Sequence, residues 1–166
     1  MSHAAFKGNL RNELNDAKKK QTIITDGPKS HGGLEETYSP VELLADTYAS
    51  CAITIMAAVA GQLGCDLTGT YADTETSVDE KEFRIAHIGI HFHMPKSLDE
   101  SHRSAIEAST RDMCIVGRSL HPDIKKRFDL HLRRIRNLCG YHKFILDKIN
   151  GPVRSDENLT LRGARI

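Results

Sequence analysis

The chain has 166 residues, of which 39% are hydrophobic, so it is long enough to enclose one core and to form one domain. Its 23 lysines and arginines nearly balance its 22 aspartates and glutamates, which argues against nucleic acid or an anionic membrane as a partner. No run of about 18 uninterrupted apolar residues predicts a membrane span, and the first residues lack the apolar core of a signal peptide, so we expect a cytoplasmic protein.

The first 25 residues predict a short β-hairpin. Apolar residues are followed by the polar segment AKKKQ at 17–21 and by a β-branched run at 22–25. Residues 26–38 are rich in glycine, proline and serine, which predicts a loop.

A long apolar helix is predicted over residues 40–63. Ser39 can serve as its N-cap, Pro40 suits the first helical position, and Glu42 stands three residues after the cap, as a capping box requires. Apolar residues occupy nearly the whole circumference, which is typical of a central, buried helix. Cys51 lies three turns into this helix.

Two strands joined by a polar turn are predicted next, over residues 67–78 and 83–94. In the second strand apolar residues alternate with three histidines, His87, His91 and His93, so one face should be buried and the other wetter. Three imidazoles at this spacing could bind a metal. No carboxylate or cysteine at matching spacing reinforces them, so we interpret them as the polar face of a sheet and expect no metal.

The remaining sequence predicts a second helix, a last strand and a C-terminal extension. The helix covers residues 98–115 and carries Cys114, and the strand covers residues 124–132. Residues 133–166 suggest one amphipathic helix followed by a polar, arginine-rich end.

The four cysteines form no CxxC pair, which argues against a structural zinc site. In a reducing compartment they are free thiols or redox-active groups rather than structural disulfides. Cys51 and Cys114 lie in apolar helices, where a cysteine can be an ordinary core residue or a functional thiol. We interpret Cys65 and Cys139 as incidental.

The order of these elements resembles the OsmC/Ohr family of thiol-dependent hydroperoxide reductases, in its OsmC-like branch. The resemblance is carried by the segments TDGPKSHGG, SPVELL, ASC and CIVGRSLHPDI. It covers roughly residues 5–132, so we assign residues 1–132 to an OsmC-like domain and residues 133–166 to an extension. It implies an α+β fold in which an antiparallel sheet is wrapped around two central helices of an intertwined homodimer.

The resemblance also implies an active site without a cofactor or a metal. Cys51 would be the thiol that attacks an organic hydroperoxide, and Cys114 would resolve the product as a disulfide. Glu42 and Arg11 would hold and activate the thiolate, and an external dithiol would restore the pair.

The sequence departs from the family pattern at two positions, and this supports an alternative function. The family glutamate directly follows the proline, where this chain has Val41, and Glu42 is one residue later, about 100° further around the helix. Ile115 follows the second cysteine, where the family often has proline. The alternative is a non-catalytic protein of the same fold that binds a small apolar ligand in the dimer groove.

Overall fold

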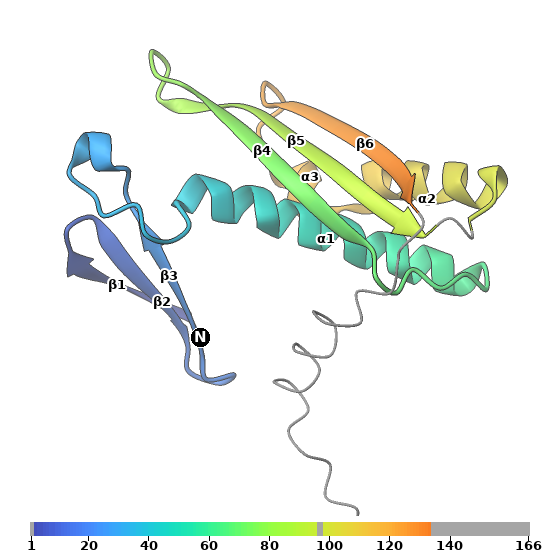
Figure 1. Ribbon diagram of the computed structural model, residues 1–166, viewed down its shortest axis with the longest axis horizontal. Helices are drawn as coiled ribbons and strands as arrows, with labels where there is room; N and C mark the ends of the chain where they lie inside the picture. Colours follow the sequence, from blue (N-terminus) through green and yellow to red (C-terminus); the bar gives the residue numbers. More distant parts are fainter. Residues whose placement is uncertain (1, 96–97, 134–166) are drawn as a thin grey trace, which may run out of the picture. The chain divides into compact units, whose positions relative to one another are not determined.

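The structure, a computed structural model, describes residues 2–95 and 98–133 (Figure 1). These residues form two three-stranded sheets and three α-helices. The first sheet contains β1 (Ser2–Gly8), β2 (Arg11–Asp16) and β3 (Gln21–Asp26), all antiparallel to their neighbours. The predicted α+β class is confirmed, whereas the extension over residues 134–166 lies outside the described residues.

The N-terminal segment has three strands, where the sequence predicted a two-stranded hairpin. Asn9 and Leu10 both have positive φ, 48° and 56°, and together they turn the chain between β1 and β2. This is the backbone of a two-residue hairpin turn, in which asparagine is favoured. The sequence did not predict this turn, because the apolar side chain of Leu10 is not typical of one.

Helix α1 (Pro40–Gln62) begins where the sequence predicted it. The Ser39 hydroxyl accepts a hydrogen bond from the Glu42 amide at 3.2 Å, and the Glu42 carboxylate accepts one from the Ser39 amide at 2.7 Å. This completes the predicted capping box. One face of the helix is buried, and it is formed by Ala45, Tyr48, Ala49, Ala52, Met56 and Ala60.

By length and composition, α1 could also cross a membrane, since its apolar window has a mean hydropathy of 1.6. The core helix of a soluble protein meets the same criterion. We interpret α1 as a core helix because its buried face packs against a sheet and a second helix within the chain.

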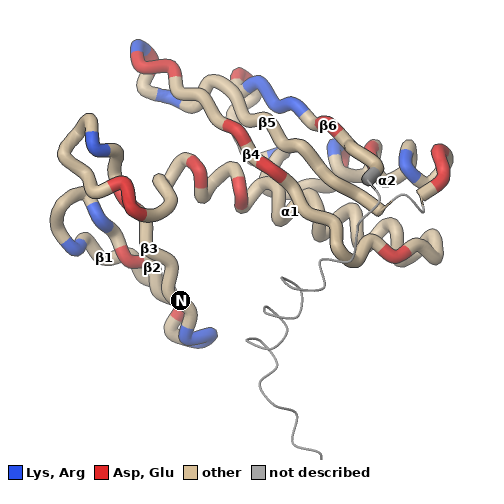
Figure 2. Tube along the Cα trace, in the orientation of Figure 1, with Lys and Arg blue, Asp and Glu red and all other residues tan. Residues whose placement is uncertain are grey.

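The second sheet has the order β4-β5-β6 and is mixed rather than wholly antiparallel. Strands β4 (Tyr71–Asp79) and β5 (Arg84–Pro95) are antiparallel, whereas β6 (Lys125–Arg133) runs parallel to β5. The chain returns to the start of the sheet through helices before it enters β6, and such a crossover produces a parallel pair. Acidic residues mark β4 and basic residues mark the start of β6 (Figure 2).

The predicted second helix is divided at Cys114. Helix α2 (Glu100–Met113) ends before the cysteine, and the short helix α3 (Ile115–Ser119) begins after it. Cys114 itself is extended, with φ −70° and ψ 106°. The periodicity of residues 98–115 could not reveal this break, because apolar residues continue through it.

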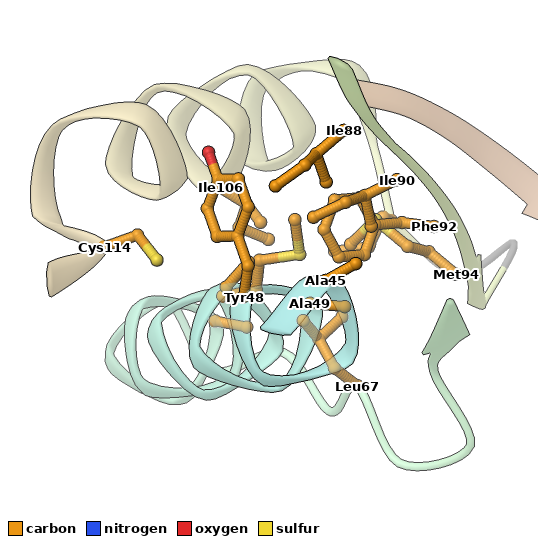
Figure 3. Close-up of a cluster of buried hydrophobic side chains, with 14 residues drawn as sticks. Ala45, Tyr48, Ala49, Leu67, Ile88, Ile90, Phe92, Met94, Ile106 and Cys114 are labelled. Atoms are coloured by element: carbon orange, nitrogen blue, oxygen red, sulfur yellow. The ribbon is translucent and has the colours of Figure 1, made fainter. Parts of the chain in front are cut away.

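The core lies between α1, α2 and the second sheet (Figure 3). The alternation predicted for β5 is confirmed, since Ile88, Ile90, Phe92 and Met94 are fully buried. Ile106 of α2 and Leu67 of the loop after α1 complete this packing.

Candidate active site

Cys51 and Cys114 are brought together from separate parts of the chain. Cys51 projects from the third turn of α1, and Cys114 occupies the break between α2 and α3. The two thiols are near enough for Cys51 to raise the pKa of Cys114. Figure 3 shows the Cys114 side chain directed toward α1, near Tyr48. Two neighbouring thiols form a pair that can be oxidised to a disulfide.

The two thiols differ in their access to solvent. Cys51 is half-buried, whereas Cys114 is only 1% exposed. A hydroperoxide arriving from solvent can therefore reach Cys51 more easily than Cys114. This asymmetry agrees with the roles that the resemblance implies for the two residues.

Burial raises the pKa of the Cys114 thiol above its ordinary value, and the neighbouring Cys51 raises it further. This pKa is lowered by the backbone amides of Gly117 and Val116 at the start of α3. The effect of burial is larger, so the net shift is upward. Neither amide forms a capping hydrogen bond with the side chain. Cys114 is therefore a protonated thiol at neutral pH.

Tyr48 lies one turn before Cys51 on the buried face of α1 and is 3% exposed. Burial raises its pKa to about 12, and the charges of Cys114 and Cys51 contribute to the shift. Its hydroxyl therefore stays protonated beside the thiol pair. Tyr48 was not predicted as a site residue; the available signal was a single tyrosine in a helix face otherwise made of alanine and methionine.

Gly117 is a second residue that the sequence analysis missed. It is buried in α3 against the Tyr48 ring, and a Cβ at this position would lie 2.6 Å from the Tyr48 hydroxyl oxygen. No side chain other than hydrogen fits there without moving the ring. Gly117 thus sets the position of the tyrosine, and through it the surroundings of the thiols.

Arg11 is held by carboxylates rather than by a thiol in the described chain. Its guanidinium donates to both carboxylate oxygens of Asp26, each at 2.7 Å, and to Glu36 at 2.7 Å. Asp26 is buried, and this arginine lowers its pKa to about 2. Within one chain, Arg11 therefore joins β2 to the end of β3 and to the loop that follows.

We expect Arg11→Met to lower the thermal midpoint by several degrees near pH 7, because it leaves the Asp26 carboxylate buried without its cation. The folded pKa of Asp26, about 2, lies below its unfolded value of about 4. The stabilisation is therefore present above roughly pH 4 and is lost as the pH falls toward 2. Thermal unfolding of both proteins across this range should show that their difference shrinks on acidification.

Lys7→Met is the matched control, because Lys7 approaches Glu13 at 3.6 Å in an exposed ion pair of the same sheet. It should change the midpoint little. A difference between Arg11→Met and wild type that does not depend on pH would contradict the assignment.

Glu42 is exposed, and its carboxylate is occupied by the capping box at the start of α1. Cys51 lies more than two turns further along the helix. In the described residues of one chain, neither Glu42 nor Arg11 contacts a thiol.

The two other cysteines were interpreted as incidental. Cys65 is half-buried, and its thiol donates a hydrogen bond to the Leu63 carbonyl at 3.8 Å. Cys139 lies outside the described residues.

Two of the three histidines of β5, His91 and His93, lie beside carboxylates. His91 Nδ1 lies 3.1 Å from Asp129, and His93 Nε2 lies 2.9 Å from Asp73. The Tyr71 ring stacks on His93 with the ring centroids 4.5 Å apart, and His93 is only 4% exposed. His93 is therefore more buried than the alternation of β5 predicted. Among residues 2–95 and 98–133 no group of three ligands could hold a metal ion.

A known protein family matches the part of the chain that contains the core and both thiols. The family model for OsmC-like proteins matches residues 32–129, which is more than half of the chain. The chain belongs to the OsmC-like protein family. The matched residues include α1 with Cys51 and the break between α2 and α3 with Cys114. No curated protein matches the chain.

Solved structures agree with this membership. A Psychrobacter arcticus 273-4 protein, named for osmotic stress induction and a detoxification response, is 29% identical, with a TM-score of 0.75 and coverage of 78% of this chain and 94% of that one. OsmC of Legionella pneumophila, an organic hydroperoxide resistance protein, is 18% identical, with a TM-score of 0.64 and coverage of 80% and 97%.

The organic hydroperoxide resistance protein OhrB of Bacillus subtilis is 15% identical, with a TM-score of 0.58 and coverage of 79% and 98%. At these last two identities the likeness shows the fold alone.

Proposed function

We propose that this OsmC-like protein reduces organic hydroperoxides with the Cys51 and Cys114 thiols. The observation that carries the proposal is the proximity of a half-buried thiol on α1 and a fully buried thiol at the break between α2 and α3. Two of the structural relatives are named organic hydroperoxide resistance proteins, which supports the same substrate class. We place the reaction in the cytoplasm, where a dithiol reductant is available.

In the first step, the Cys51 thiolate attacks one oxygen of the peroxide bond. The oxygen–oxygen bond breaks, the terminal oxygen stays on sulfur with its proton as the Cys51 sulfenic acid, and the other oxygen leaves as an alkoxide that takes a proton from water to become the alcohol. The cysteine sulfur is oxidised and the hydroperoxide is reduced.

In the second step, the Cys114 sulfur attacks the Cys51 sulfenic acid and releases water. The two sulfurs form a disulfide, and an external dithiol then reduces this disulfide to the two thiols while becoming a disulfide itself. Because the pKa of Cys114 is raised, we expect disulfide formation to accelerate as the pH rises through the alkaline range.

The test of the proposal is the number of thiols lost. One equivalent of an organic hydroperoxide should remove two titratable thiols from each chain, and peptide mapping should recover a disulfide between Cys51 and Cys114. Hydrogen peroxide at the same concentration serves as the comparison oxidant. If hydroperoxide removes no thiols beyond the buffer control, the non-catalytic alternative, which Val41 favours, is the better interpretation.

We also propose that the protein is a homodimer. Three apolar residues of α1, Leu43, Leu44 and Ile55, are half-buried and lie outside the core of the chain. A helix apolar on nearly all sides needs cover on nearly all sides, and a second copy of the chain would supply it.

Sedimentation equilibrium at micromolar concentration should therefore give the mass of two chains, with no dependence on the redox state of the thiols. Ile55→Asp should shift the mass toward one chain, because it places a charge on an apolar position outside the core of the chain. Ser104→Asp, at an exposed position of α2, is the control. A wild-type protein with the mass of one chain would refute the dimer.

A further inference from the structure

A cavity of about 470 Å³ opens next to Tyr48, and its rim is strongly basic. Four cationic side chains line it: Arg111 from the end of α2, Arg118 from α3, and Lys126 and Arg127 from β6. We call these residues, together with Tyr48, Gly117 and Phe128, the basic pocket. The adjoining lysines and arginine appear as one continuous basic segment at the start of β6 (Figure 2).

Most of this positive charge is not neutralised within the described residues. Arg127 pairs with Asp129 at 3.0 Å. By contrast, Arg118 donates to the Asp112 backbone carbonyl and Lys126 to the Gly117 carbonyl, each at 3.2 Å, so neither meets a carboxylate. Arg111 forms no ion pair with any residue among 2–95 and 98–133. Like charges that converge on one cavity repel each other, and a bound anion would relieve the repulsion.

The types of cation define the chemistry of the ligand. Guanidinium groups match the planar geometry of oxyanions and bind carboxylate or phosphate through paired hydrogen bonds. One guanidinium comes from the α2 terminus and another from α3, so they approach the cavity from different elements. A single oxyanion group could be held between them.

The inner wall of the pocket is aromatic. The Tyr48 and Phe128 rings meet edge to face, with centroids 5.4 Å apart. A volume of this size is in the range of small-molecule sites, which combine an apolar wall with a few polar groups. The pocket can therefore accept a small apolar group behind the charged head.

We propose that the basic pocket binds a small organic oxyanion, a carboxylate or a phosphate monoester, with Arg111, Arg118 and Lys126 on the charged group and the aromatic wall on the remainder. This site is distinct from the thiol pair, although Tyr48 borders both. Its occupation requires no thiol chemistry, so the proposal stands or falls separately from hydroperoxide reduction.

The experiment is a heteronuclear NMR titration of the full-length protein with inorganic phosphate, phenyl phosphate and benzoate, each against sodium chloride at the same ionic strength. We expect saturable shifts of the Gly117, Arg118 and Lys126 amides, with phenyl phosphate binding more tightly than inorganic phosphate because its ring meets the aromatic wall. Tighter binding of benzoate than of phenyl phosphate would assign the site to carboxylates. Shifts that never saturate, or that spread equally over all basic surfaces, would overturn the proposal.

Two variants with the same change in charge complete the test. Arg111→Gln combined with Arg118→Gln should weaken phenyl phosphate binding by at least about tenfold. Lys18→Gln combined with Lys19→Gln, in the exposed turn between β2 and β3, should leave it within about twofold after correction for ionic strength. Cys51→Ser should bind the anion as wild type does. Equal weakening by both double variants would show attraction by net charge alone and would overturn the site.

Discussion

Cys51→Ser is expected to lose hydroperoxide reduction almost completely, by at least about 1,000-fold in rate. A serine hydroxyl is not ionised near neutral pH and cannot accept an oxygen atom as a thiolate sulfur does. The substitution is nearly isosteric at a half-buried position, so the fold should be retained. Stopped-flow or coupled measurement of hydroperoxide consumption gives the rate, and circular dichroism checks the fold.

The corresponding change at Cys114 should have a different result. Cys114→Ser should still consume about one equivalent of hydroperoxide and then stop, because Cys51 is oxidised but cannot form the disulfide. A sulfenic acid reagent should label Cys51 in this variant. The difference between the two variants separates the attacking thiol from the resolving thiol.

Cys65→Ser is the matched control, since Cys65 is another half-buried free thiol and lies in the loop after α1. It should keep the wild-type rate and the wild-type thiol stoichiometry. If Cys65→Ser lost activity while Cys51→Ser retained it, the assignment of the attacking thiol would be wrong.

The second large effect is expected from Gly117→Ala. The added methyl group would overlap the Tyr48 ring, which is buried between α1 and α3 and has little room to retreat. Overpacking of this kind costs about 1–3 kcal/mol of the free energy of unfolding. Displacement of the ring also alters the site next to both thiols, so the disulfide should form more slowly after oxidation.

Gly61→Ala is the control for Gly117→Ala. Gly61 is also helical, but no atom lies within 4 Å of a Cβ built there. Replacing glycine by alanine in an open helical position should be neutral or stabilising by up to about 1 kcal/mol. Urea unfolding of the three proteins measures both changes; equal stability of Gly117→Ala and wild type would show that Tyr48 is not held by Gly117.

Features that depend on neighbouring residues were predicted from the sequence. The capping box of Ser39 and Glu42 uses contacts three residues apart, so a short sequence pattern specifies it. The alternation of β5 likewise follows from the two faces of a strand and needs only the order of apolar residues. The resemblance to the family, confirmed by the match over residues 32–129, added the pairing of Cys51 with Cys114 as an expectation.

Features that depend on distant residues were missed or misread. Arg11 was expected at a thiol of the dimer, which stays a prediction; its partners within one chain, Asp26 and Glu36, are 15 and 25 residues away. His93 was expected on a wetter face, but Tyr71 from the neighbouring strand covers it. Neither pairing leaves a local pattern in the sequence.

The sequence by itself determined where α1 begins, which residues of β5 face the core and that Cys51 lies on α1, because spacing along one element controls these properties. The tertiary structure alone decided that β6 runs parallel to β5, that Gly117 leaves room for Tyr48, and that four cations from three elements converge on one cavity. These properties arise where separate elements meet, and the packing between elements is set by shape and burial rather than by local periodicity.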